Sequence, residues 1–418
     1  MRSEGRRTGG VLSILALGTL LQPFALSGQQ AVQAPTLAVG RSERDLSAGD
    51  FDDPAWEQAP SAGQPVQQEP VEGEPPTLRT DCRVIATPSA LLVRFVMEEP
   101  AFEIVARELR RDADLSADDR INFILDTYHD HRNAYYFATN PNGVRVDGLI
   151  TEEQRNTEDG LPSLDWDTVW DLRVRRTLTG WDALFRIPYA SLNFPGETNG
   201  IWGFNFARNI RRRTETDRWS GWRRPYTLTK VSLAGNLLRL PALSARRLRQ
   251  LAPYAAGALD HRADPSDTDL LGKAGLDFRY GVSSAVEAGL TVNTDFAETE
   301  ADPQQFNFGR TSLFFPEKRS FFLQRSQIFA FGTQSTTLPF FSRTIGLKTN
   351  VNTDVSVPIP IDAGLKLSGK LGMTDFGVLG VQTRAGSDEP RTDFLAGRFK
   401  EDLGHASYVG GLFTDIER

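Results

Sequence analysis

Cysteine is nearly absent from this sequence, and long apolar runs are missing after its first thirty residues. The single Cys82 cannot form an intramolecular disulfide, so stability has to come from packing. Its strand-like surroundings, R-V-I-A-T, predict a small buried side chain. No uncharged apolar run of about 18 residues follows residue 30, so the remaining chain is predicted to have no transmembrane helix.

Other absences narrow the chemistry. The sequence has no G-x-S-x-G nucleophile motif, no G-x-x-x-x-G-K-[ST] phosphate loop and no cysteine cluster. A formal net charge of -7 argues against a general nucleic-acid binder. Lysine is scarce, and none precedes Lys230. The base composition of the gene explains this arginine preference as readily as anion recognition does.

The first residues have the pattern of an export signal. Arg2, Arg6 and Arg7 form a positive region, an apolar run follows at residues 11–21, and small residues lie at 25–27. The run is too short to span a bilayer as a helix, although an uncleaved anchor is the alternative. We therefore expect residues 1–27 to be a signal peptide that exports the protein. No cysteine lies near the predicted cleavage site, so a lipoprotein anchor is not expected.

The next part of the chain divides into a lead-in and a β domain. Residues 28–78 are rich in proline, glutamine, glycine and acidic residues, which predicts an extended and loosely packed segment. Residues 79–240 carry β-rich runs separated by polar turns such as N-P-N-G. The run T-V-W-D-L-R-V-R-R-T alternates apolar and charged residues, as a strand with one buried face does. We expect a β-sandwich here.

From about residue 251 the pattern changes to glycine-rich strands. Leu276, Phe278 and Tyr280 alternate with Asp277 and Arg279. The same pattern recurs in residues 285–295, 363–372, 376–383, 392–399 and 406–414. Small and charged residues on one side suit an outer-membrane barrel with a wet lumen. The fold class is thus predicted as all-β: a sandwich, then the first strands of an outer-membrane-type antiparallel β-barrel in residues 251–418. About six strands are recognisable and eight are needed for closure, so we expect a truncated piece; the alternative is a small soluble β domain.

Acidic residues offer the main candidates for catalysis. Asp165, Asp167 and Asp171 share one parity in D-W-D-T-V-W-D, and glycoside hydrolysis uses two carboxyl groups across a sugar. If the protein is a hydrolase, these three are the first suspects; a solvated strand entrance is the simpler interpretation.

Metal and cofactor signals are weak. His129 and His131 flank Asp130 in Y-H-D-H-R, where a metal site competes with an ordinary hairpin turn, and the turn is preferred. We predict no metal site and no cofactor. Calcium on surface acids such as Asp118 and Asp119 is a weaker option.

Tryptophan is concentrated between positions 166 and 222, where six of the seven occur. Trp181 and Trp202 lie within strand patterns and are predicted to be core. The ligand-binding residues are predicted to be Trp219, Trp222, Trp166, Arg208 and Asn205, because flat rings bind pyranose faces and polar side chains bind hydroxyls. Capping of the barrel is the competing use for exposed rings. The basic run at residues 211–219 is a candidate anion-binding site, and a solvated strand end is the alternative.

Two stretches resemble known families. Residues 79–240 resemble the family 9 carbohydrate-binding fold placed at the front of large bacterial outer-membrane proteins; the matching segments are I-N-F-I-L-D-T-Y, R-N-A-Y-Y-F-A-T-N-P-N-G, G-W-D-A-L-F-R-I-P-Y-A-S-L-N-F and W-G-F-N-F-A-R-N-I-R-R-R. The later part resembles the uncharacterised barrel domain DUF5916; the matching segments are V-N-T-D-F-A-E-T-E-A-D-P-Q-Q, F-F-P-E-K-R-S-F-F-L-Q-R-S-Q-I-F, P-F-F-S-R-T-I-G-L and D-A-G-L-K-L-S-G-K.

The resemblance implies an exported sandwich presented beside an outer-membrane barrel, with a polysaccharide or oligosaccharide as ligand. The sequence departs from both patterns. Sugar-binding members clamp the ligand between two tryptophans, and D-L-S-A-D-D-R stands where one is usual, without an aromatic. In the second stretch Ser320 replaces a usual proline, and Gln324 and Arg325 replace a usual Glu-Gly pair. Between barrel strands, Glu317 and Arg319 would face the wet lumen while phenylalanines anchor the segment.

These observations predict a carbohydrate-binding protein of the outer membrane that captures or passes glycan and does no chemistry of its own. Its partners would be glycan and outer-membrane lipid, not nucleic acid, with the sandwich in the periplasm or at the cell surface. A hydrolase acting on O-glycosyl bonds is the first alternative. A structural envelope protein whose sandwich caps the barrel is the second.

Overall fold

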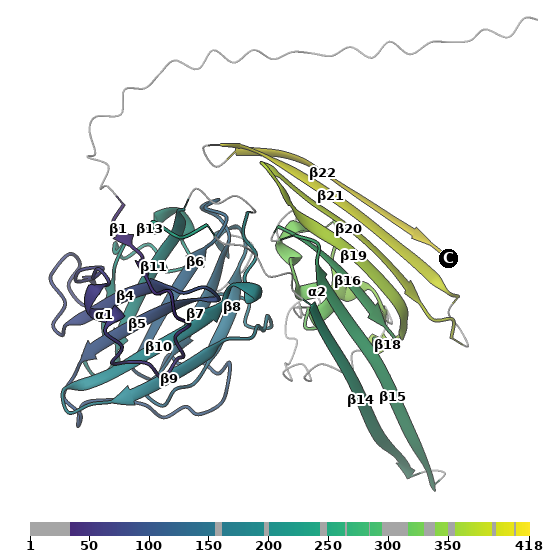
Figure 1. Ribbon diagram of the computed structural model, residues 1–418. Coiled ribbons are helices and arrows are strands. Elements are labelled where there is room, and N and C mark those ends of the chain that lie inside the picture. Colours follow the sequence, from purple (N-terminus) through teal and green to yellow (C-terminus); the bar gives the residue numbers. More distant parts are fainter. Residues whose placement is uncertain are drawn as a thin grey trace, which may run out of the picture. The chain divides into compact units, whose positions relative to one another are not determined.

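The structure is a computed structural model (Figure 1). It describes residues 34–154, 161–195, 200–242, 249–263, 266–283, 285–294, 317–329, 339–349, 356–386, 390–404 and 407–418. The predicted signal peptide, residues 1–27, lies outside these ranges. No helix among the described residues is long and apolar enough to cross a membrane.

Two β-sheets form the first half of the described chain (Figure 1). The eight-stranded sheet runs in the order β1-β13-β11-β6-β7-β8, with β12 joined to β11 and β3 joined to β12. Its strands are β1 (Thr36–Ala38), β3 (Val66–Glu69), β6 (Arg120–Asp126), β7 (Ala134–Thr139), β8 (Val146–Ile150), β11 (Trp202–Ile210), β12 (Glu215–Arg218) and β13 (Gly235–Leu238). The five-stranded sheet, in the order β2-β4-β5-β10-β9, contains β2 (Gly40–Arg41), β4 (Thr80–Ala86), β5 (Ala90–Glu98), β9 (Asp171–Arg176) and β10 (Gly180–Pro188).

The core between these two sheets is aromatic. Phe123 of β6 meets Phe185 of β10 edge to face with ring centroids 4.9 Å apart, and Phe95 of β5 meets Phe206 of β11 at 5.4 Å. These rings come from both sheets and are fully buried. The predicted sandwich over residues 79–240 is therefore confirmed in its architecture.

Several smaller expectations are also confirmed. Trp181 and Trp202 are fully buried in the same core, as is Cys82 of β4. His129 and His131 lie in the turn between β6 and β7, where both backbones adopt positive φ values of 51° and 58°. The histidine pair thus belongs to a hairpin connection, as the polar context indicates.

The expected loose lead-in is wrong for residues 34–78. β1 pairs in parallel with β13, about two hundred positions later in the chain, and β2 pairs in parallel with β4. A short helix, α1 (Ala55–Gln58), buries Trp56 and fixes its indole through a 2.8 Å hydrogen bond to the Asp50 carbonyl. The segment packs into the sandwich because short strands and single large side chains anchor it despite its polar composition.

A third sheet of seven antiparallel strands forms the second half, in the order β14-β15-β16-β19-β20-β21-β22 (Figure 1). The strands are β14 (Arg249–Ala263), β15 (Ser266–Gly281), β16 (Val286–Val292), β19 (Ile361–Leu371), β20 (Thr374–Thr383), β21 (Thr392–Gly404) and β22 (Ser407–Glu417). A two-stranded sheet joins β17 (Leu347–Thr349) to β18 (Ser356–Pro358). Within the described residues the third sheet is open, with β14 and β22 at its edges, so the predicted antiparallel pairing is confirmed and a closed barrel is not seen.

The third sheet has reversed polarity. Several charged residues lie on the covered face: Asp277, Glu287 and Lys366 are each less than a tenth exposed, beside an apolar cluster that contains Leu379 and Val381. On the other face, large apolar side chains follow one another across neighbouring strands through the pairs Leu367↔Val378 and Phe376↔Phe399. The exposed apolar residues of this outward face include Val292, Leu365, Leu367, Val378, Leu395, Phe399, Val409 and Phe413.

The covered face is closed by a short segment, residues 317–329, with helix α2 (Ser320–Leu323) in it. Lys366 donates hydrogen bonds to the carbonyls of Phe321 and Gln324, and Ser320 donates to Asp277 at 2.6 Å. These bonds fix the segment to the polar side of the sheet.

Within this segment one expectation is corrected. Glu317 and Arg319 are buried and paired with each other at 2.8 Å, so they do not face a wet lumen. The phenylalanine anchor is present, since Phe321 and Phe322 are both 4% exposed. Arg325 has a left-handed φ of 53°, a conformation that glycine adopts more readily than other residues. Residues 313–316, which directly precede Glu317 and include the F-F-P of the matching segment, lie outside the described residues.

Candidate functional site

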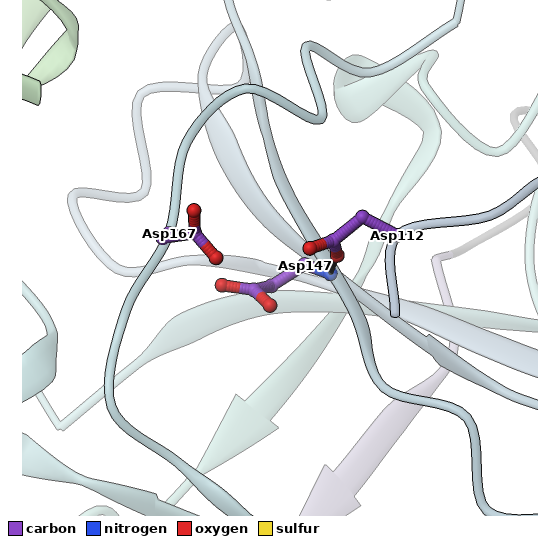
Figure 2. A group of neighbouring side chains, drawn as sticks. All are labelled: Asp112, Asp147 and Asp167. Atoms are coloured by element: carbon purple, nitrogen blue, oxygen red, sulfur yellow. Dashed lines mark hydrogen bonds between the residues drawn. The ribbon is translucent and has the colours of Figure 1, made fainter. Parts of the chain in front are cut away.

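Three aspartates from separate parts of the sandwich meet at one point (Figure 2). Asp112 comes from the loop before β6, Asp147 from β8 and Asp167 from the loop before β9. Each supplies a carboxylate oxygen, and these oxygens all lie within 4.8 Å of one another. Figure 2 shows the carboxylates directed toward a shared centre.

A single arginine balances part of this charge. Arg111 donates to Asp147 and to Asp167 at 2.6 Å each, and to Asp112 at 2.9 Å. Asp147 also accepts a 2.8 Å bond from the backbone N–H of Thr168. Oxygen ligands of this kind suit a hard divalent cation. Arg111 occupies that role here, so the cluster acts as an ion-paired knot that joins two loops to β8.

Burial governs the titration of this knot. The side chain of Asp147 is fully buried, and desolvation raises its pKa to about 6 against the lowering effects of Arg111 and of the Thr168 N–H. Asp112 has its pKa raised for the same reason. Asp167 is exposed at its surface edge. The cluster therefore presents one accessible carboxylate above a buried one.

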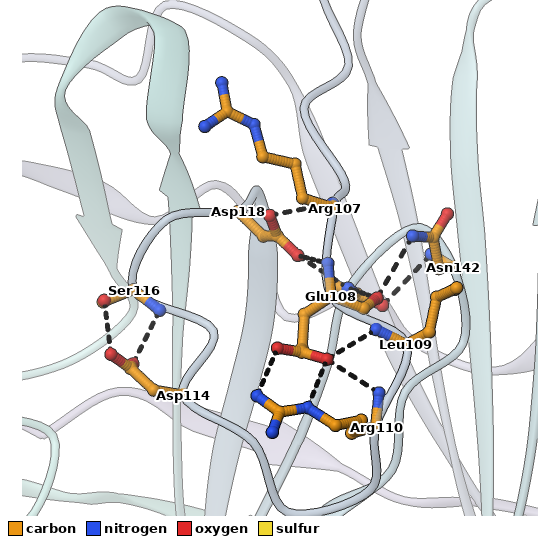
Figure 3. A network of polar contacts seen from close by, with 9 residues as sticks. Arg107, Glu108, Leu109, Arg110, Asp114, Ser116, Asp118 and Asn142 are labelled. Carbon is orange, nitrogen blue, oxygen red and sulfur yellow. Dashed lines mark hydrogen bonds and ion pairs between the residues drawn. The ribbon is translucent and has the colours of Figure 1, made fainter.

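The loop that carries Arg111 is held by a hydrogen-bond network (Figure 3). Asp118 accepts from the backbone N–H groups of Arg107 and Glu108 at 2.9 and 3.0 Å. Glu108 accepts from the guanidinium of Arg110, with Nε at 3.2 Å and Nη2 at 3.1 Å, and from two backbone N–H groups. The arginine side chain and these amides hold the pKa of Glu108 at about 2.

Asp118 and Asp119 are not surface acids, contrary to the context expected for calcium. They are 2% and 1% exposed, and Asp119 accepts from the backbone of Val105 and of Arg211. Their oxygens are thus used to fix the 105–108 loop and the end of β11. This explains two adjacent acids at this position without a metal ion.

The suspected catalytic acids do not share a strand. β9 begins at Asp171, so Asp165 and Asp167 lie in the preceding loop and strand parity does not align the three. Asp167 pairs with Arg111, while Asp171 lies 3.6 Å from Arg186. The structure therefore brings together Asp167 with Asp112 and Asp147, neither of which the sequence pattern singled out.

The predicted ligand-binding residues fall into two groups. Trp219, Trp166, Arg208 and Asn205 are each no more than 6% exposed. The ring of Trp219 stacks on Phe206 with centroids 5.9 Å apart, which corrects the expectation that a polar segment leaves it exposed. Whether any of the four contacts a ligand stays a prediction.

The buried polar members of that group have internal partners. Arg208 pairs with Glu99 at 3.2 Å, and Asn205 bonds both the N–H and the carbonyl of Ser220. Trp166 packs against Tyr135 with centroids 5.1 Å apart. In this conformation these side chains join the two sheets and their loops.

Trp222 is the predicted ligand residue that reaches the surface. It is partly exposed in the loop after β12 and lies against Gly73, where an added Cβ would come 3.5 Å from the indole ring. The guanidinium of Arg223 lies 5.9 Å from the ring centroid, and the backbone N–H of Arg224 bonds Glu72. We name Trp222, Arg223, Glu72 and the partly exposed Tyr226 the Trp222 surface. It combines exposed rings with polar groups of both charges.

Comparisons with known proteins gave one family match and several similar solved structures. The model of DUF5916, a domain of unknown function, matches residues 245–358. A family 9 carbohydrate-binding module from Caldicellulosiruptor kristjanssonii, solved with glucose and with cellotriose, aligns at 15% identity with a TM-score of 0.33; the alignment covers 50% of this chain and 96% or 94% of that chain. A proposed carbohydrate-binding protein from Bacteroides uniformis ATCC 8492 aligns at 14% identity and a TM-score of 0.38, covering 49% of this chain and 99% of its own. No curated protein matches the chain.

Proposed function

We propose that this protein is a carbohydrate-binding protein of the bacterial cell envelope, which holds its third sheet against lipid and captures or passes glycan at the outer membrane. The observation that carries the proposal is the reversed polarity of the third sheet. In water a sheet buries apolar residues and exposes polar ones. Here Asp277, Glu287, Lys366 and Arg398 are covered, while a row of large apolar side chains such as Leu367, Val378 and Phe399 is exposed.

Lipid is the solvent that this pattern fits. Membrane-facing strands place apolar side chains outward and small or charged side chains inward, with a period of two residues. Leu365 and Leu367 are exposed on β19, while Lys366 and Ser368 between and beside them are buried. The same alternation continues on β21, with Leu395 and Phe399 outward and Arg398 and Lys400 inward.

A charge on the outward face tests the lipid contact. Replacing Leu367 by arginine is expected to destabilise the membrane-inserted protein by about 2–4 kcal/mol, the cost of a cation facing lipid on a β-strand. The measurement is recovery of the full chain in outer-membrane pellets after a urea wash. Asp393→Arg is the control, because it replaces a charge that is already exposed on the same face. Wild-type protein that the wash removes completely would contradict the proposal.

Glycan binding is assigned to the Trp222 surface. A flat aromatic ring offers apolar area to the C–H face of a pyranose, and neighbouring charged groups bond its hydroxyls. Among the predicted ligand residues, Trp222 has the partly exposed ring, and Arg223 and Glu72 lie beside it. One ring without an opposing clamp suits an extended chain, which gains contact along its length.

A tryptophan truncation tests this assignment. Trp222→Ala in the full chain is expected to weaken binding to the glycan that an array identifies by about tenfold, the loss of one stacking contact. Leu178→Ala, which removes a 97% exposed side chain elsewhere on the sandwich, is the matched control. Retention of no glycan by wild-type protein would remove the binding part of the proposal, and an equal loss in both variants would remove this site.

A further inference from the structure

Four arginines gather at one end of the eight-stranded sheet. Arg120 begins β6 and lies opposite Asn209 of β11, and Arg211 and Arg212 follow directly where β11 ends. Arg107 comes from the loop that precedes β6. We name Arg107, Arg120, Arg211 and Arg212 the arginine surface.

Two acids of this region, Asp118 and Asp119, are buried beneath the arginines. Asp118 accepts from the backbone N–H of Arg107 at 2.9 Å, and its neighbour Asp119 accepts from the backbone N–H of Arg211 at 2.7 Å. Two adjacent carboxylates therefore hold the two arginine backbones close together. Figure 3 shows the guanidinium of Arg107 directed away from Asp118. These two negative charges are buried, whereas Asp114 of the same loop is exposed and Arg107, Arg211 and Arg212 are exposed as well.

Asp114 offsets part of the charge of Arg120, and the other three guanidiniums are not paired with a carboxylate among the described residues. Within the described part of the chain, the guanidiniums of Arg107, Arg211 and Arg212 have no ion pair, and Arg120 donates its Nε to the neutral amide oxygen of Asn209. Other exposed arginines differ, as the pair between Arg110 and Glu108 shows. In a chain with a net charge of -7, this surface is a local reversal of sign.

An exposed aromatic ring lies in the same loop as Arg107, between β5 and β6. Phe102 is 81% exposed, and the next residue, Glu103, is bound to Arg213 at the end of β11. An exposed phenylalanine has no packing role, whereas its ring can cover the apolar face of a sugar. Guanidinium groups bind carboxylates and sulfates through two parallel hydrogen bonds. Ring and forks together match a sugar polymer that carries anionic groups.

We propose that the arginine surface, with Phe102, binds an acidic polysaccharide made of uronate or sulfated sugars. This inference rests on the proposed glycan binding and adds the substrate class and a second contact area to it. The guanidiniums would pair with the anionic groups while the ring packs on a pyranose. Because the surface contacts are exposed, binding depends strongly on ionic strength.

The test measures binding of the full chain to polygalacturonate, dextran sulfate and neutral dextran. Wild-type protein is expected to prefer either charged polymer, and the preference is expected to shrink as salt rises from about 0.05 to 0.5 M. Arg211→Ala with Arg212→Ala is expected to weaken the charged-polymer binding about tenfold or more. The lysine version of the same pair keeps the charge without the fork and should restore only part of it. Arg44→Ala, at an exposed arginine on the other sheet's side, is the control.

The outcomes separate this inference from the function it rests on. Binding of neutral dextran without any preference for the charged polymers overturns the arginine surface alone. Equal binding to DNA and to the acidic polymers overturns recognition of sugar in favour of general polyanion attraction. Wild-type protein that binds neither charged polymer overturns the arginine surface, and the proposed glycan binding is overturned as well only when the glycan array also shows no ligand. An unchanged affinity in the double alanine variant, with charged-polymer binding present, also overturns the inference.

Discussion

Replacing Arg208 by alanine is expected to lower the free energy of unfolding by about 3–5 kcal/mol, because removing one member of a buried ion pair leaves the other charge unpaired. The Arg208 side chain is 1% exposed, and its guanidinium donates to Glu99 and to the hydroxyl of Thr80. It also donates to the carbonyls of Arg79 and Glu98. Urea unfolding followed by tryptophan fluorescence measures the change.

The partner of this pair supplies the sharper control. Arg208→Ala combined with Glu99→Ala is expected to be less destabilising than the sum of the two single changes, because the double variant leaves no unpaired buried charge. Arg173→Ala, at an exposed position of β9, should stay within about 0.5 kcal/mol of wild type. A loss below about 1 kcal/mol for Arg208→Ala would show that the pair does not hold the sheets together. That result would return Arg208 to the candidates for ligand binding.

The second large effect concerns the segment over the third sheet. Arg319→Ala is expected to cost about 3–5 kcal/mol of stability in that sheet, since it removes the partner of buried Glu317 and the donors to the carbonyls of Ser342 and Ile345. Its guanidinium also lies 4.2 Å from the centroid of the Phe322 ring. Hydrogen exchange of residues 317–329 in the full chain is the measurement, and faster exchange there is the expected result.

Two further variants check that this effect comes from the buried fork. Arg319→Lys keeps the charge but has one nitrogen in place of the guanidinium, so it should recover only part of the protection. Arg384→Ala removes an ion pair to Asp362 in which the arginine side chain is about half exposed, and it should cost less than about 1 kcal/mol. Exchange in Arg319→Ala that matches wild type would mean that Lys366 and Ser320 fix the segment without it.

The sequence predicts most of the sandwich because its strands carry their own signals. β10 and β11 read as apolar and aromatic runs, and β9 alternates, so their burial follows from local pattern. β1 and β3 have no such pattern. Their place depends on pairing with β13 and β12, which lie far along the chain, and short polar strands carry no mark of a distant partner. The sequence does not predict β14, because its alanines, glycine and proline do not alternate between apolar and polar residues.

The candidate sites are harder to predict because the burial of their side chains depends on residues from other segments of the chain. Trp219 and Trp222 lie three positions apart in the same polar stretch, yet rings of β11 cover Trp219 and leave Trp222 at the surface. Asn205 faces away from the main core but is covered by the residues that follow β12. The acidic knot joins Asp112, Asp147 and Asp167 through folding alone. The acidic residues that follow Arg111 in the sequence are the one local feature that points to this cluster.

The reversed polarity of the third sheet also bears on how the chain reaches its native state. The sandwich buries its aromatic rings within its own two sheets, so it can complete folding in water. The exposed apolar side chains on the outward face of the third sheet are not stabilised by water. In water they would cause separate copies of the protein to associate before a native partner is bound. Under the proposed lipid contact, the sandwich would fold in water and the third sheet would complete its folding in the membrane. Insertion into the membrane would then have to be faster than self-association. Expression without membranes should give aggregates that still contain correctly folded sandwiches.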